Sequence, residues 1–74
     1  MAKIDLNYRG MSCPMPMLKL SMAARHGATG DVFEVVCDDP IFEADIKSWC
    51  DKTGNVLTNL SKSGKDIIAT ITKK

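Results

Sequence analysis

The chain has 74 residues, of which 45% are hydrophobic and 26% charged, and this ordinary globular composition excludes a disordered polypeptide. Ten lysines and arginines against nine aspartates and glutamates give a net charge of +1. This charge excludes non-specific electrostatic binding to nucleic acid or anionic membranes as the main activity. No apolar run approaches the roughly 18 residues of a membrane-spanning helix, and the N-terminus has no signal-peptide core. We therefore expect a single cytoplasmic domain over residues 1–74 that does not bind membranes.

The first half of the chain predicts a strand, a loop and a helix. Residues 2–7 alternate apolar and polar side chains, as in a strand, and residues 8–12 break that alternation. Pro14 and Pro16 suit the first turn of a helix, where the missing N–H groups would have no partner. We expect this helix to run to about His26.

The second half predicts a strand, a helix and two further strands. Residues 31–37 are rich in β-branched residues and indicate a largely buried strand. An N-cap carboxylate in the Asp38-Asp39-Pro40 segment, with proline at the first helical position, predicts a helix that ends at Gly54. The last strands are expected over residues 56–61 and 66–72, with a turn at 63–65.

The element order β-α-β-α-β-β predicts an α/β (α+β) two-layer sandwich. A strand–helix–strand unit makes a right-handed crossover to a parallel neighbour, and two such units place both helices on one face of the sheet. We therefore expect a mixed four-stranded sheet covered by two helices and closed by a hairpin.

Three cysteines, Cys13, Cys37 and Cys50, do not form a recognisable framework. An odd number in so short a chain is unlike a secreted disulfide scaffold, and no CxxC pair or compact metal-ligand spacing is present. We expect neither a metal nor another cofactor. Cys50 belongs to the apolar face of the second helix, whereas Cys37 is either a small buried residue or a resolving thiol for Cys13.

Cys13 has the position of an activated thiol. It immediately precedes the predicted helix, where unpaired N–H groups and the positive end of the helix dipole stabilise a thiolate. Its pKa should therefore fall below the usual value of about 8.5. Arg9 and Lys19 could add cationic support, and the only histidine, His26, lies too far along the helix to act as a base for Cys13.

The segment Gly10-Met11-Ser12-Cys13-Pro14-Met15-Pro16 resembles the GxxCPxP signature of the TusA/SirA-like family of small sulfur carriers. The resemblance continues at Lys19, at Asp38-Asp39-Pro40, at Asp45-Ile46 and at Trp49-Cys50, and spans nearly the whole chain. It implies the two-layer sandwich, and it implies that Cys13 carries a persulfide sulfur. Gly10, Pro14 and Pro16 would support this cysteine.

The same resemblance implies two protein partners. A donor, such as a cysteine desulfurase or a rhodanese-like protein, would load the sulfur, and an acceptor protein would receive it. The pathway stays open between tRNA thiolation, cofactor assembly and sulfur oxidation. We expect the carrier to be a monomer.

A candidate partner surface lies beside the cysteine. The first helix has two apolar stripes, and the one formed by Met15, Leu18 and Met22 is either part of the core or an exposed, adaptable docking surface. The carboxylates that would shape the charge met by partners are Asp38, Asp39 and Asp45.

Two other functions compete with sulfur carriage. Cys13 and Cys37 could form the disulfide of a thiol redox protein. A small regulatory or nucleic-acid-binding module is the third alternative, although the near-zero net charge and four aromatic residues make direct nucleic-acid binding a poor fit.

Overall fold

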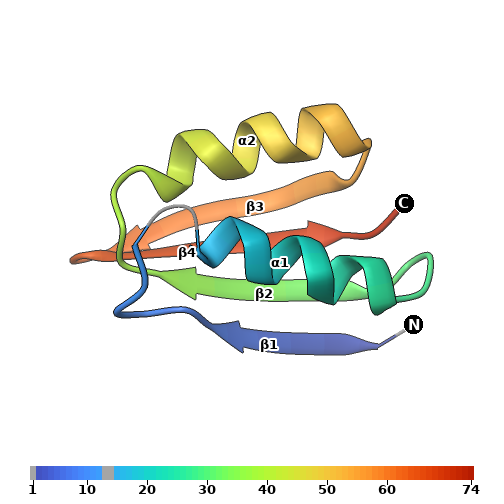
Figure 1. The fold of residues 1–74 in the computed structure, drawn as a ribbon, viewed down its shortest axis with the longest axis horizontal. Coiled ribbons are helices and arrows are strands. Elements are labelled where there is room, and N and C mark those ends of the chain that lie inside the picture. The colour runs from blue at the N-terminus through green and yellow to red at the C-terminus, as the bar shows by residue number, and fades with distance from the viewer. Residues whose placement is uncertain (1, 13–14) are drawn as a thin grey trace.

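A computed structural model describes residues 2–12 and 15–74 of the chain. It contains the predicted elements in the predicted order (Figure 1). They are β1 (Lys3–Asn7), α1 (Met15–His26), β2 (Val32–Cys37), α2 (Phe42–Thr53), β3 (Val56–Ser63) and β4 (Asp66–Thr72). Strand β3 extends two residues beyond its predicted end, so a turn of only Gly64 and Lys65 separates it from β4.

The four strands form one mixed sheet in the order β1-β2-β4-β3. Strands β1 and β2 are parallel, and β4 is antiparallel to both β2 and β3. The mixed four-stranded sheet is therefore confirmed. The closing strand β4 occupies the position between β2 and β3, so it separates the two strands that α2 connects.

Both helices pack on one face of the sheet, as predicted, and together they enclose a single core (Figure 1). Alternate residues of β2 and β4 are buried, because successive side chains of a strand point to opposite faces. The strands contribute Phe33, Val35, Cys37, Ile67, Ala69 and Ile71 to this core, and the helices contribute Leu20, Ala24, Phe42, Ile46 and Cys50. The core position predicted for Cys50 is thus confirmed, and Cys37 is buried, as one of its two alternatives requires.

The start of α2 differs from the sequence prediction. The helix begins at Phe42, and the residue before it, Ile41, already has helical φ and ψ and makes no side-chain cap. The Asp39 carboxylate instead accepts a hydrogen bond from the backbone N–H of Ile41 at 3.0 Å, and the Asp39 carbonyl accepts one from Phe42 at 3.0 Å. The predicted N-cap was wrong because Asp39 uses its carboxylate in a turn that precedes the helix.

The end of α2 is as predicted. Gly54 has a φ of +79°, in the left-handed region that favours glycine, and its N–H donates to the carbonyl of Cys50 at 2.9 Å. Neither of the helices described is long and apolar enough to cross a membrane.

Candidate functional site

The centre of the predicted site, Cys13 and Pro14, lies outside the described residues, and the predictions for both continue to depend on the sequence. The segments around them are described. Because β1 and β2 are parallel, they end at the same edge of the sheet. Strand β4 begins at that edge, since Ile67 pairs with Cys37. The loop of residues 8–12 leaves β1 there and leads toward α1 (Figure 1).

The first part of this loop is held by backbone hydrogen bonds. The N–H of Tyr8 donates to the carbonyl of Val36 at 2.8 Å, which continues the pairing of β1 with β2 beyond the strand itself. The side chain of Tyr8, predicted as a loop residue, is buried in the core. The side-chain oxygen of Asn7 accepts a hydrogen bond from the N–H of Arg9 at 3.1 Å, and Gly10 then turns the chain with a φ of +80°.

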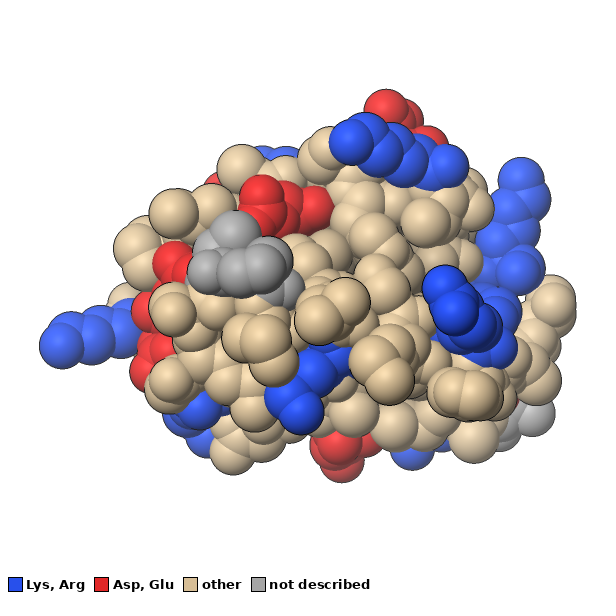
Figure 2. Space-filling view, viewed as in Figure 1, with Lys and Arg blue, Asp and Glu red and all other residues tan. Residues whose placement is uncertain are grey.

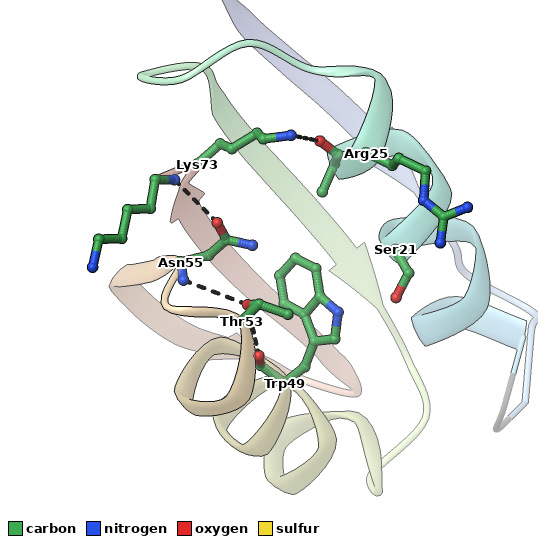
Figure 3. Close-up of a pocket in the computed structure, with 8 residues that line it drawn as sticks. Ser21, Arg25, Trp49, Thr53, Asn55 and Lys73 are labelled. Atoms are coloured by element: carbon green, nitrogen blue, oxygen red, sulfur yellow. Dashed lines mark hydrogen bonds between the residues drawn. The ribbon is translucent and has the colours of Figure 1, made fainter.

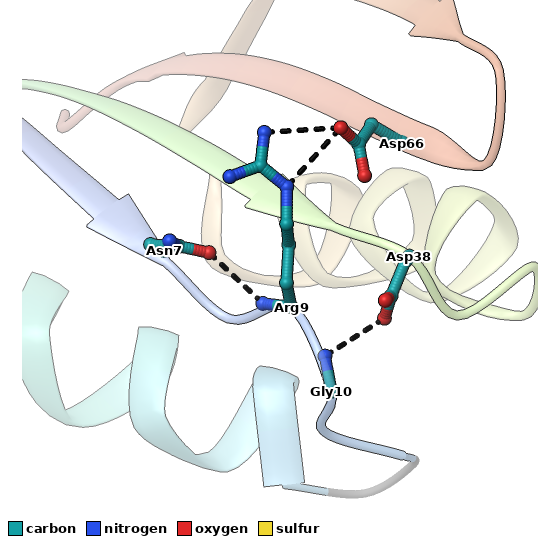
Figure 4. A network of polar contacts seen from close by, with 5 residues as sticks. All are labelled: Asn7, Arg9, Gly10, Asp38 and Asp66. Carbon is teal, nitrogen blue, oxygen red and sulfur yellow. Dashed lines mark hydrogen bonds and ion pairs between the residues drawn. The ribbon is translucent and has the colours of Figure 1, made fainter.

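Asp38 ties this loop to the end of β2. One carboxylate oxygen of Asp38 accepts a hydrogen bond from the backbone N–H of Gly10 at 3.0 Å (Figure 4). The sequence predicted Asp38 as part of the helix-start segment and of the charge that partners meet. The structure adds a positioning role, because the bond links two segments 28 residues apart in the chain.

Arg9 is paired with an acidic residue that the sequence analysis did not select. Its Nε and Nη2 atoms donate to one carboxylate oxygen of Asp66 at 3.1 and 3.0 Å (Figure 4). The hydrogen bond and the charge of Asp66 raise the pKa of Arg9 above its ordinary value. Asp66 is the first residue of β4, and the antiparallel pairing of β4 with β2, which the sequence did not predict, places it at this edge.

Helix α1 begins beside this edge, and Pro16 lies in its first turn. The N–H of Met15 donates to the carbonyl of Ser12 at 3.0 Å, and Pro16 is fully buried in the first turn. Lys19, predicted as cationic support, is exposed on the same helix.

The second apolar stripe of α1 is exposed. The exposed fractions are 43% for Met15, 53% for Leu18 and 55% for Met22. The other stripe supplies the core with Leu20 and Ala24. Of the two alternatives left open by the sequence, the structure therefore selects the exposed surface.

A cavity of about 410 Å³ lies between the start of α2 and the β3–β4 hairpin. Asp38 and Pro40 line one side, and Lys62 and Lys65 line the other. Lys62 forms an ion pair with Glu43, which was not predicted because both residues look like ordinary surface charges in the sequence. The predicted partner residue Asp45 is half-buried in the first turn of α2.

The other two thiols are enclosed in the core. Cys37 is fully buried and Cys50 is 6% exposed, and both are free thiols. Burial raises the pKa of Cys37 and of Cys50, because a thiolate loses its hydration in the core. Neither thiol is therefore accessible as a nucleophile.

The remaining candidate groups in the described part of the chain do not form a site. His26 is exposed at the far end of α1. Among residues 2–12 and 15–74, no group of three or more His, Cys, Asp or Glu side chains could hold a metal ion.

Comparison with known proteins identifies similar chains in bacteria and archaea. Residues 4–73 match the family described as Sulfurtransferase TusA. A candidate sulfur carrier protein of Aquifex aeolicus is 40% identical over 68 residues, which are 92% of this chain and 34% of that protein. The chain thus spans about a third of the length of this relative. The sulfur carrier protein TusA of Pseudomonas putida is 29% identical over 69 residues, 93% of this chain and 86% of the relative.

A solved structure shares the fold. The crystal structure of a SirA-like protein from Desulfitobacterium hafniense superposes with a TM-score of 0.75 at 29% sequence identity, and the match covers 97% of this chain and 96% of that one. The similarity therefore extends over the whole two-layer architecture.

Proposed function

Because this chain belongs to the TusA family, we propose that it is a sulfur carrier that accepts sulfane sulfur as a persulfide on Cys13 and relays it to an acceptor protein. One observation about the thiols carries the assignment to Cys13. The chain has three cysteines, and Cys37 and Cys50 are enclosed in the core with raised pKa values. Cys13 follows an exposed loop and precedes α1, where a thiolate is favoured.

The transfer itself needs no cofactor. The Cys13 thiolate attacks the terminal sulfur of a donor persulfide, and a new sulfur–sulfur bond forms as the bond within the donor persulfide breaks. The donor cysteine leaves as a thiolate. One sulfur–sulfur bond replaces another, so no external oxidant or reductant is consumed. Delivery repeats the exchange, with the acceptor thiolate attacking the terminal sulfur on Cys13.

The partners we propose are a donor of the cysteine desulfurase or rhodanese-like class and a separate acceptor protein, both in the cytoplasm. The stripe of Met15, Leu18 and Met22 supports such docking, because flexible methionines on an exposed helix face adapt to more than one partner. Lys19 and the carboxylates of Asp39 and Asp45 add charged groups to the surrounding surface.

The loop before Cys13 would act as a fixed support for the thiol. Gly10 donates a hydrogen bond to Asp38, Arg9 is paired with Asp66, and Pro16 is buried in the first turn of α1. The first two contacts tie the loop before the CPxP segment to residues at the end of β2 and the start of β4. We propose that the anchors present Cys13 to partners in one orientation, which reduces the entropy lost on docking.

The test is sulfur loading measured by intact-protein mass spectrometry. After incubation with a persulfide-loaded donor, the wild-type chain should gain the mass of one sulfur, and Cys13→Ser should gain none. Cys50→Ser is the matched control and should load normally. Loading of Cys13→Ser would overturn the proposal.

The same experiment addresses a thiol redox function. An intramolecular Cys13–Cys37 disulfide would lower the mass by two hydrogens and would be lost in Cys37→Ala. Cys37 is fully buried, and its raised pKa leaves little thiolate to attack Cys13, so sulfur gain is the expected result.

A further inference from the structure

A second cavity lies away from the loop, where the C-terminal halves of both helices meet the end of the chain. It has a volume of about 390 Å³, within the range of small-molecule sites. Helix α1 contributes Ser21 and Arg25, and helix α2 contributes Trp49. Arg25 lies ten residues beyond Met15, so the cavity is about 15 Å along α1 from the start of that helix.

The charged side chains around this cavity are cationic. Arg25, Lys73 and Lys74 line it, and the described lining residues include no Asp or Glu side chain. Figure 2 shows blue side chains at the right-hand end of the molecule, where α1 and the chain end in Figure 1. The net charge of +1 therefore conceals a local cationic site.

The two lysines are held in place by the helix ends. The ammonium group of Lys73 donates to the carbonyl of Ala24 in the last turn of α1. The backbone N–H of Lys74 donates to the side chain of Asn55 at 3.0 Å, just beyond the end of α2. Cations are favoured at the C-terminal end of a helix, so the Lys73 ammonium is held at the cavity before any ligand binds, and the bond to Asn55 fixes the backbone of Lys74 beside it.

An aromatic ring completes the cavity. Trp49 is half-buried, and Figure 3 shows its indole between Ser21 and Arg25 on one side and Asn55 and Lys73 on the other. A planar base stacks on such a ring, and a phosphate pairs with arginine and lysine side chains. A neutral aromatic ligand would use only the ring, and inorganic phosphate would use only the cations.

We propose that this cavity binds a nucleoside phosphate, with the base against Trp49 and the phosphate among Arg25, Lys73 and Lys74. One ring and three cations match a single nucleotide, either free or at the end of an RNA strand. The site is separate from the proposed sulfur chemistry, and a ligand there leaves the loop around Gly10 uncovered.

Trp49 makes the test direct, because it is the only tryptophan in the chain. Titration with AMP or GMP at low salt should quench its fluorescence, whereas adenosine and inorganic phosphate should bind more weakly. Arg25→Ala and Lys74→Ala should each weaken binding by about two- to fivefold, as expected for loss of one exposed charge. Lys52→Ala removes an exposed cation of α2 outside the cavity lining and should have no effect.

A short single strand with a terminal phosphate separates the two sources of the ligand. Tighter binding of the strand assigns the site to an RNA end, and tighter binding of the mononucleotide assigns it to a free nucleotide. Absence of quenching at about 1 mM nucleotide, or equal losses in Lys52→Ala and Arg25→Ala, would overturn the proposal. Sulfur loading of Cys13 does not enter this test, so its result is independent of the proposed carrier function.

Discussion

The two glycines that flank α1 are required for different physical reasons. Gly10, in the loop before the helix, has a φ of +80°, and no atom lies within 4 Å of the position that a Cβ would occupy. Gly27, directly after the helix, is not one of the glycines with positive φ. A Cβ on Gly27 would lie 2.7 Å from Cζ of Phe33, a ring that is 1% exposed.

The two ends of α1 are therefore held in place in different ways. The far end is fixed by close packing against the core. The loop before the near end is exposed at Arg9 and Gly10, and its conformation is set by a backbone turn and by the hydrogen bonds that Asn7 and Asp38 accept from its N–H groups. A loop held in this way keeps its shape while its surface stays open to a partner protein.

The two ends of α1 also differ in whether their cationic side chains are paired with carboxylates. Near the loop, the guanidinium of Arg9 is paired with Asp66. At the far end, Arg25 and Lys74 line a cavity whose described lining residues include no Asp or Glu side chain. Paired charges suit docking between proteins, since their main effect is on orientation, whereas clustered cations suit a small anion.

The largest effect on stability is expected for Gly27→Ala. The added methyl group would overlap the ring of Phe33, and overpacking of this kind costs about 1–3 kcal/mol. The free energy of unfolding, measured by urea denaturation, should fall by that amount. Sulfur loading should be unchanged at temperatures where the variant is folded, because Gly27 lies at the opposite end of α1 from the loop.

A double substitution tests the cause of this loss. If the ring of Phe33 is the obstacle, Phe33→Leu should make the added cost of Gly27→Ala much smaller, since the two residues are in contact. An unchanged cost in the Phe33→Leu background would contradict the packing explanation.

A smaller loss is expected for Gly10→Ala. The space around the new methyl group is open, so the cost is the left-handed backbone alone, about 1–2 kcal/mol for a residue with a Cβ. Gly64→Ala is a matched control, because Gly64 has a φ of +60° and also has no atom within 4 Å of its Cβ position. Urea denaturation should give similar losses for both variants.

Only Gly10→Ala should also slow sulfur loading, because Gly10 lies in the loop that precedes Cys13 and Gly64 lies in the β3–β4 hairpin. Equal loading rates for the two variants would mean that the conformation of this loop does not affect the thiol.

The sequence predicted the sheet and both helices because the apolar patterns are clear. It could not choose between the two apolar stripes of α1, since Met15 and Leu18 are as hydrophobic as the residues that are buried. Packing of the opposite stripe against the sheet decides which one remains exposed. The strand order could not be predicted from the sequence, because the position of β4 between β2 and β3 depends on long-range pairing.

At the site, the sequence identified the segments but missed the contacts between them. Asp38 was selected for its charge, and its bond to Gly10 was not foreseen because 28 residues separate the two. Asp39 was assigned to the wrong backbone position, since a turn and a helix start favour the same residue types. Contacts of this kind depend on the assembled sheet edge.

The smallest effect is expected at Asp38, and two substitutions distinguish charge from hydrogen bonding. Asp38→Asn keeps a side-chain oxygen that can accept from the N–H of Gly10, so the free energy of unfolding should change little. Asp38→Ala removes the acceptor and should lower the free energy of unfolding by about 0.5–1.5 kcal/mol, the net value of one hydrogen bond.

If positioning of the loop matters for sulfur transfer, Asp38→Ala should slow loading of Cys13 and Asp38→Asn should retain most of the rate. If both variants lose the rate equally while only Asp38→Ala loses stability, the negative charge of Asp38 acts on the donor directly, and its bond to Gly10 is purely structural. Loading rates at low and high salt complete the test, because a charge effect is screened by salt and a positioning effect is not.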